Sequence, residues 1–229
     1  MQTKSTKEKS SKNIYCISGL GADKRVFTKL QFKGYQPVHI EWLAPEKKES
    51  LTEYAKRLTN NITEENPILI GLSFGGIVAV EIAKQIPTEK VILISSAKTT
   101  TEIPWYFRMF RWLPVYLLIP FKSLLWAVYW LINWFFGLEK KEERKLLKAI
   151  LIDTDAKFLK WAINCVVFWK NETIPDSLHH IHGTSDRIFP LAFVEPDIVI
   201  NKGGHFMVMN RAKSISQFID LIITKNNII

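Results

Sequence analysis

The stretch that decides the fold of this chain is PILIGLSFGG, residues 67–76. Its first four residues are apolar and rich in isoleucine, which predicts a short buried strand. The ten residues after Gly76 are mostly apolar and stop at Pro87, which predicts a helix. The G-x-S-x-G motif therefore falls on a tight turn between a strand and a helix. We expect Ser73 to lie there in strained backbone, with its hydroxyl exposed above the positive end of the helix dipole, and predict that it is a nucleophile.

A serine nucleophile needs a base, and the chain offers five histidines: His39, His179, His180, His182 and His205. The first four lie in two predicted strands, where His180 and His182 share one face, and a structural role is the simpler interpretation for them. His205 follows a compact predicted strand in the loop NKGGHF. The two glycines before it give this loop the freedom to carry the imidazole over the edge of the sheet. We therefore predict that His205 is the base.

The acid that orients the base is predicted to be Asp186. It lies in the loop HGTSDRIFP, just past the end of a predicted strand. In open parallel sheets, ligands and chemistry collect beyond the carboxyl ends of the strands, where Ser73 and His205 are also expected. Asp186 would hold the imidazole in the right tautomer and stabilise its charged form. The alternative is a loop aspartate that pairs with Arg187.

Together, the elbow GLSFG, the acid loop and the base loop GGHF, in the order Ser, Asp, His, carry a family resemblance. The chain resembles proteins of the α/β-hydrolase fold, in a short form without the first two strands, from Asn13 to the C-terminus. The resemblance implies an oxyanion hole made by the backbone N–H groups of Leu20 and Phe74. Family members commonly carry His-Gly in the loop that holds the first donor, whereas this chain has Ser18-Gly19. What supports that loop is left open.

The whole chain fits this fold, because strand and helix patterns alternate along it. We predict a mostly parallel six-stranded sheet with helices on both faces, and the resemblance implies the strand order 2-1-3-4-5-6. The predicted strands lie near residues 13–18, 36–42, 67–72, 90–95, 177–182 and 196–201, and the predicted helices near 24–32, 51–63, 75–86 and 211–224. The predicted domains are a disordered Lys/Ser-rich tail (1–12), an α/β core (13–98 and 173–229) and an α-helical cap inserted after the fourth strand (99–172).

The middle of the predicted cap is rich in tryptophan. Three of these tryptophans, Trp126, Trp130 and Trp134, repeat at four-residue spacing and would lie along one side of a helix. A membrane span needs about 20 apolar residues, but only residues 123–138 lie between Lys122 and Glu139, so no span is predicted. The helix would either pack over an apolar pocket or meet lipid peripherally, helped by nearby basic side chains. The tryptophans are Trp105, Trp112, Trp126, Trp130 and Trp134, and the basic residues are Arg108, Arg111 and Lys122.

Composition limits the other functions. The net charge is +9, and much of it comes from lysines of the N-terminal tail and from a mixed-charge stretch, so no nucleic-acid partner is expected. The two cysteines, Cys16 and Cys165, make no disulfide framework, which favours a reducing, cytoplasmic location, and no apolar segment of the tail resembles a signal peptide. No metal-ligand spacing or phosphate-loop motif is present, so neither a metal nor a cofactor is expected. The oligomeric state is left open.

The predicted activity is that of a serine hydrolase, which cleaves a small apolar carboxylic ester through the triad and an acyl-enzyme. Several alternatives use the same residues: an acyltransferase, a thioesterase, an amidase or a C–C hydrolase. A ligand-binding homologue without catalysis is a further alternative. The haloalkane-dehalogenase branch of the fold is excluded, because its nucleophile is an aspartate and the residue here is Ser73.

Overall fold

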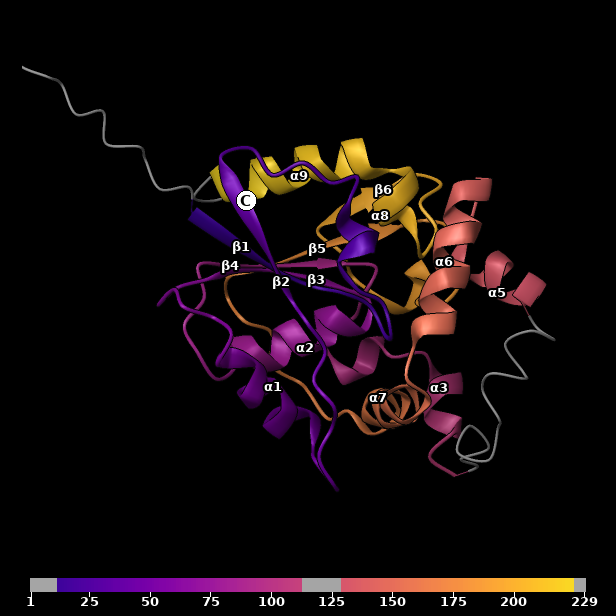
Figure 1. The fold of residues 1–229 in the computed structure, drawn as a ribbon, viewed down its shortest axis with the longest axis horizontal. Coiled ribbons are helices and arrows are strands. Elements are labelled where there is room, and N and C mark those ends of the chain that lie inside the picture. The colour runs from indigo at the N-terminus through magenta and orange to yellow at the C-terminus, as the bar shows by residue number, and fades with distance from the viewer. Residues whose placement is uncertain (1–11, 113–128, 225–229) are drawn as a thin grey trace, which may run out of the picture.

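A six-stranded sheet, in which every pair of neighbours is parallel, organises the chain (Figure 1). The structure is a computed structural model that describes residues 12–112 and 129–224. The strand order is β2-β1-β3-β4-β5-β6, which confirms the predicted order. The strands are β1 (Lys12–Ile17), β2 (Tyr35–Ile40), β3 (Ile68–Leu72), β4 (Lys90–Ile94), β5 (Leu178–Gly183) and β6 (Ile198–Ile200).

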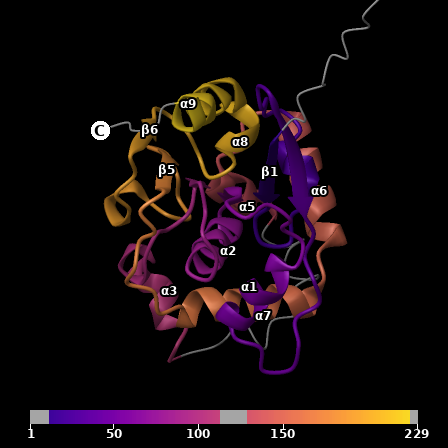
Figure 2. The ribbon, with the colours of Figure 1, turned by 90° about the vertical axis from the view of Figure 1, so that its left-hand side faces the viewer.

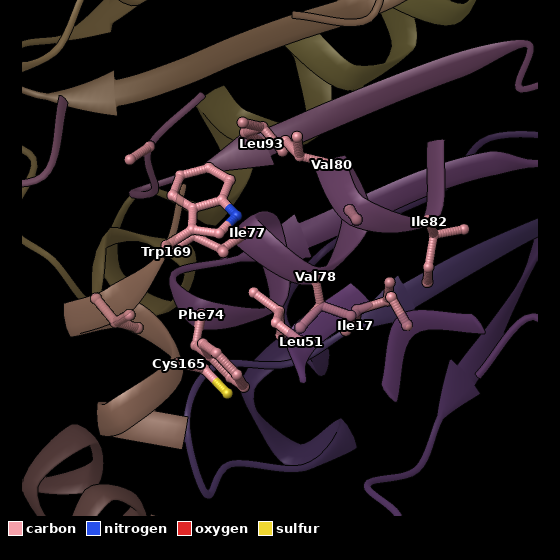
Figure 3. Packing of buried hydrophobic residues seen from close by; sticks show 14 of the residues in the cluster. Ile17, Leu51, Phe74, Ile77, Val78, Val80, Ile82, Leu93, Cys165 and Trp169 are labelled. Carbon is pink, nitrogen blue, oxygen red and sulfur yellow. The ribbon is translucent and has the colours of Figure 1, made fainter. Parts of the chain in front are cut away.

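Helices cover both faces of the sheet (Figures 1 and 2). Helices α1 (Leu51–Thr59) and α2 (Phe74–Ala83) lie on one face, and α9 (Ala212–Thr224) lies on the other. The side chains of each strand alternate between two buried clusters, so that Leu69 packs with α2 whereas its neighbours in β3 pack toward α9. Figure 3 shows the first cluster, in which side chains of α2 meet Ile17 and Leu93 of the sheet and Leu51 of α1.

The helix predicted near residues 24–32 is wrong. Only the single 3₁₀ turn η1 (Lys24–Phe27) forms there. The Asp23 side chain accepts a hydrogen bond from the Arg25 amide and begins the turn. The Thr28 hydroxyl then donates to the Arg25 carbonyl, and Leu30 donates to the carbonyl three residues before it. Valine, phenylalanine and threonine are also weak helix formers, so the turn does not continue as an α-helix.

Between β4 and β5 the regular elements of the described residues are all helices. The elements are η2 (Thr100–Glu102), α3 (Trp105–Met109), α5 (Tyr129–Phe136), α6 (Lys141–Asp153) and α7 (Ala156–Phe168). Trp126 and Lys122 lie outside the described residues, as does the predicted tail except for Lys12, which begins β1. The division of the chain into core and cap stays a prediction. Among the helices that the structure describes, none has both the length and the apolar character needed to cross a bilayer.

Both cysteines are buried and free. Cys16 lies in β1 and Cys165 in α7. Burial raises the pKa of the Cys165 thiol to about 12, and it raises the pKa of Cys16 far above its usual range. The thiolate is the reactive form of cysteine, so neither side chain is a nucleophile at neutral pH. The predicted cytoplasmic location is not tested by this geometry and stays a prediction.

Candidate active site

Ser73 occupies the strained turn that its motif predicts. Strand β3 ends at Leu72 and helix α2 begins at Phe74, and between them Ser73 has φ 52° and ψ −121°. Such backbone is costly for a residue with a side chain, and it persists only where the surroundings hold it. Here the Ser73 amide donates to the Ile94 carbonyl at 2.9 Å, and the Ser73 carbonyl accepts from Ser96 Oγ at 2.7 Å. Both backbone groups of the turn are therefore tied to the end of β4.

Two glycines of the motif let the backbones approach. A Cβ on Gly71 would lie 2.4 Å from the Cα of Gly76, across the turn. A Cβ on Gly75 would lie 2.2 Å from the Ser18 carbonyl oxygen, at the end of β1. Both obstacles are backbone atoms, which cannot move aside as a flexible side chain can. The predicted reason for these glycines, a collision of strand and helix, is confirmed.

The structure brings the three predicted site residues together. His205 Nε2 lies 2.9 Å from Ser73 Oγ, and His205 Nδ1 lies 2.8 Å from Asp186 Oδ2. The second oxygen of Asp186 accepts the amides of Ile188 and Phe189, at 2.8 and 2.9 Å. The side chains of Asp186 and His205 are buried, whereas Ser73 is partly exposed. Asp186 thus pairs with His205, and the alternative pairing with Arg187 is not observed.

The charge on Asp186 is set by two opposing effects. Burial by itself would raise the pKa of this carboxyl group. The charge and hydrogen bond of His205, together with His182 and the Phe189 amide, outweigh burial and hold the pKa of Asp186 below its usual value. The carboxylate is therefore ionised at neutral pH. It accepts the proton on Nδ1 of His205 and so leaves Nε2 free to receive the proton of Ser73.

Two further histidines lie beneath the acid loop, and the sequence interpretation gave them only a structural role. His182 Nε2 lies 2.7 Å from the Phe189 carbonyl oxygen and 3.6 Å from Asp186 Oδ2. Because a carbonyl only accepts, this nitrogen carries the proton. His182 Nδ1 then accepts from His180 Nε2 at 3.1 Å. Burial lowers the pKa of His182 and lowers that of His180 well below its usual value, so both rings are neutral.

The predicted faces of these strands are confirmed. His180 and His182 are fully buried on one face of β5, and His179 lies partly exposed on the other. His39 stacks on the ring of Phe27, with 5.8 Å between the ring centroids. One signal in the sequence pointed to the contact of His182 with the acid loop. This residue lies on the buried face of β5, next to the last residue of the strand and four positions before Asp186.

The amides predicted to form an oxyanion hole lie beside the nucleophile. Leu20 and Phe74 line the same cavity as Ser73, and in the part of the chain that the structure describes neither amide donates a hydrogen bond. Side chains hold the carbonyls of Gly19 and Ala22, which flank Leu20 and Gly21. Ser18 Oγ donates to the Ala22 carbonyl at 2.6 Å, and Trp42 Nε1 donates to the carbonyls of Ala22 and Gly19 at 3.0 and 3.3 Å. Thr154 Oγ1 lies 3.0 Å from the Gly21 carbonyl oxygen.

A cavity of about 480 Å³ opens from the Ser73 hydroxyl and is walled by the helices between β4 and β5. Its volume lies in the range of small-molecule sites. Within the described ranges, 12–112 and 129–224, no three His, Cys, Asp or Glu side chains are grouped so that they could hold a metal ion. The walls are mainly apolar and include Phe107, Phe110, Ile132, Phe136, Leu147, Ile150, Leu159, Ile163 and Val166.

No protein-family model matches this chain, and no curated protein matches its sequence. Solved structures match it over nearly its whole length. An esterase from Exiguobacterium antarcticum has 14% identity and a TM-score of 0.68, and the match covers 93% of this chain and 92% of the esterase. A bromoperoxidase from Bacillus anthracis has 15% identity, a TM-score of 0.69 and coverage of 94% and 93%. An enol-lactonase from Burkholderia xenovorans LB400 has 15% identity, a TM-score of 0.66 and coverage of 94% and 92%. At such identities the likeness is one of fold.

The neutral, buried state of His180 predicts an acid-sensitive fold. The unfolded chain takes up a proton on this residue below about pH 6.5, whereas the folded chain does not until its lowered pKa is reached. The free energy of unfolding therefore falls as the pH drops from about 6.5 toward the lowered pKa of folded His180, by up to about 1.4 kcal/mol per pH unit for this one group. We expect His180→Gln, which keeps a donor for His182, to flatten the dependence of the unfolding free energy on pH. Urea unfolding at a series of pH values measures it.

The control for this experiment is His179→Gln, a change at the half-buried neighbour on the opposite face of β5. Burial lowers the pKa of His179 too, but this side chain keeps contact with water. We expect a smaller change in slope than for His180→Gln. Equal slopes for the wild-type chain and His180→Gln would contradict the assignment of a neutral, buried His180.

Proposed function

The chain has the α/β-hydrolase fold, and we propose that it is a serine hydrolase that cleaves carboxylic esters with an apolar acyl or alcohol part. The observation that carries the proposal is the hydrogen-bonded series from Ser73 through His205 to Asp186, with steps of 2.9 and 2.8 Å, at the wall of an apolar cavity. A nucleophile, a base and an orienting carboxylate in contact are the parts that acyl transfer to serine requires.

In the proposed reaction, Ser73 Oγ attacks the ester carbonyl while His205 Nε2 takes the hydroxyl proton. Ionised Asp186 stabilises the imidazolium. The amides of Leu20 and Phe74 donate to the oxyanion, each worth about 3–4 kcal/mol in comparable acyl-transfer enzymes. The tetrahedral intermediate collapses, and His205 gives its proton to the departing alcohol. Water then loses a proton to His205 and attacks the acyl-enzyme, which releases the carboxylic acid and restores Ser73.

The cavity favours an apolar substrate. Its walls bury hydrocarbon, and burial of each methylene contributes about 0.8 kcal/mol. Thioesters, amides, acyl transfer and C–C cleavage use the same residues, and the solved structures of this fold carry names as different as esterase, bromoperoxidase and enol-lactonase. The strained backbone of Ser73 argues against a protein that only binds a ligand. A binding site gains nothing from holding a serine at φ 52°.

We expect Ser73→Ala to reduce hydrolysis of p-nitrophenyl esters to the uncatalysed background, because the nucleophile is gone. Asp186→Asn should lower kcat by about 10⁴-fold with little change in KM, since the amide favours the wrong tautomer of His205. Initial rates over a range of substrate concentrations measure both effects. The matched control is Ser185→Ala, which removes an exposed hydroxyl next to the acid. It should keep full activity, and an active Ser73→Ala chain would refute the proposed mechanism.

We also infer what supports the oxyanion loop in the absence of the usual histidine. Ser18 and Trp42 donate hydrogen bonds to the carbonyls of Gly19 and Ala22. These bonds fix the backbone on both sides of Leu20 and so fix the direction of its N–H group. The Trp42 ring also packs on Phe74 and Phe158, with centroid distances of 5.5 and 5.2 Å. Trp42 is thus a positioning residue, which acts on the oxyanion through the loop.

Trp42→Phe keeps an aromatic ring, smaller than indole, and removes the N–H group. We expect kcat to fall about tenfold and KM to change little, because the loop would hold the transition state less well than before and the substrate equally well. The control is Trp161→Phe, which makes the same change in a tryptophan that donates to the Glu49 carbonyl at 3.0 Å, away from the loop. Steady-state kinetics on both variants decide the matter. Equal losses in the two variants would mean that Trp42 acts through general packing alone.

A further inference from the structure

Helices α3 and α5 are apolar on two sides. Their inner side chains, among them Phe107, Ile132 and Phe136, line the cavity above Ser73. Their outer side chains are large, apolar and open to solvent: Trp105 is 56% exposed, Met109 57%, Trp112 (just after α3) 90%, Trp130 72%, Trp134 52% and Phe135 38%. A helix that is apolar all round belongs in a protein core or in lipid. Among residues 12–112 and 129–224, no group of matching chemistry covers these outer side chains.

The exposed apolar side chains are concentrated here. Twelve large apolar residues are exposed in the described part of the chain. Five of them lie on α3 or α5, and a sixth, Trp112, lies three residues after the end of α3. Single exposed apolar residues are ordinary, but a group of this size marks a surface for a partner or a membrane. Four of the six are tryptophans, and this ring gathers at the boundary between hydrocarbon and water. We call this group of six side chains the aromatic surface.

The segment of sequence that carries the aromatic surface has charges of one sign only. The sequence from Ile103 to Leu138 contains no aspartate or glutamate. Arg108 is exposed on α3, and the Arg187 guanidinium lies over the Trp134 ring, 4.3 Å from its centroid. Arg111 lies over the ring of Phe168 at 6.0 Å. Among the described residues, none of these three guanidinium groups forms an ion pair with a carboxylate.

We propose that the aromatic surface docks on an anionic phospholipid bilayer, with its tryptophans at the level of the headgroups and its arginines on the lipid phosphates. The charge pattern selects this occupant. A second copy of the chain on the same surface would set arginines against arginines, which is unfavourable. A bilayer supplies both hydrocarbon for the rings and negative charge for the guanidinium groups. The net charge of +9 adds a general attraction.

The docking gives the cavity a route to its substrate, a consequence that rests on the proposed function. Tyr106 and Phe107 of α3 and Phe136 of α5 belong to the cavity wall, and their neighbours on the same helices belong to the aromatic surface. An apolar ester dissolved in the bilayer would thus enter between these helices without crossing water. The surface itself does not need catalysis, so its binding is measured separately from turnover.

The test is co-sedimentation of the full chain with vesicles of phosphatidylcholine alone and of phosphatidylcholine mixed with phosphatidylglycerol, at low and at high salt. We expect binding to the mixed vesicles that weakens in high salt, with a blue shift of tryptophan fluorescence. Ser73→Ala should bind as the wild-type chain does. Because this variant cannot turn over a substrate, a failure of the hydrolase proposal and a failure of the docking proposal are distinguishable.

Two double variants test whether the aromatic surface is the part of the chain that binds the vesicles. Trp105→Ser with Trp130→Ser should lower the partition onto mixed vesicles by about tenfold or more, because bound apolar area is lost. Leu43→Ser with Leu221→Ser removes two exposed apolar side chains elsewhere and should bind as before. The proposal fails if mixed vesicles do not bind the chain at low salt, or if the tryptophan variant binds like the wild type. It also fails if the chain forms a dimer that this variant abolishes, since a second copy would then cover the aromatic surface.

Discussion

Strand β3 and helix α2 meet at Ser73 with their backbones in contact, and the rest of the site depends on this approach. Glycine at positions 71 and 75 removes the side chains that would collide with Gly76 and with the end of β1. The turn then directs the Ser73 hydroxyl out of the sheet at φ 52°, and hydrogen bonds to the end of β4 hold it there. The backbone strain is maintained because sheet and helix are both fully buried around it.

The parallel sheet converts that single turn into a site. Every strand ends at the same edge, so the segments that follow β1, β5 and β6 reach Ser73 from different directions. They carry the Leu20 amide, Asp186 and His205. The helices between β4 and β5 then close over the same edge and supply the apolar wall, and Thr154, after α6, contacts the oxyanion loop directly. The wall and the proposed oxyanion hole are therefore mechanically connected.

Much of this arrangement could be predicted from the sequence, because it depends on local patterns. Short isoleucine-rich runs predict the strands, and the glycines around Ser73 predict the turn. The predicted helix near residues 24–32 failed because a threonine hydroxyl and an aspartate cap favour one 3₁₀ turn. The support of the oxyanion loop by Trp42 could not be derived from the sequence, and the contact of His182 with Asp186 was indicated only by the place of His182 on a buried face four residues before the acid. Those contacts join groups whose approach depends on the packed sheet rather than on any motif.

Covalent labelling measures whether the packed turn and its partners activate the Ser73 hydroxyl. A fluorophosphonate reacts when the serine oxygen attacks phosphorus and displaces fluoride, a step that requires the base and the oxyanion donors to act together. We expect one adduct, seen as a mass increase of the intact wild-type chain, and none on Ser73→Ala under the same conditions. An unlabelled wild-type chain, or an equal adduct on both chains, would contradict this expectation.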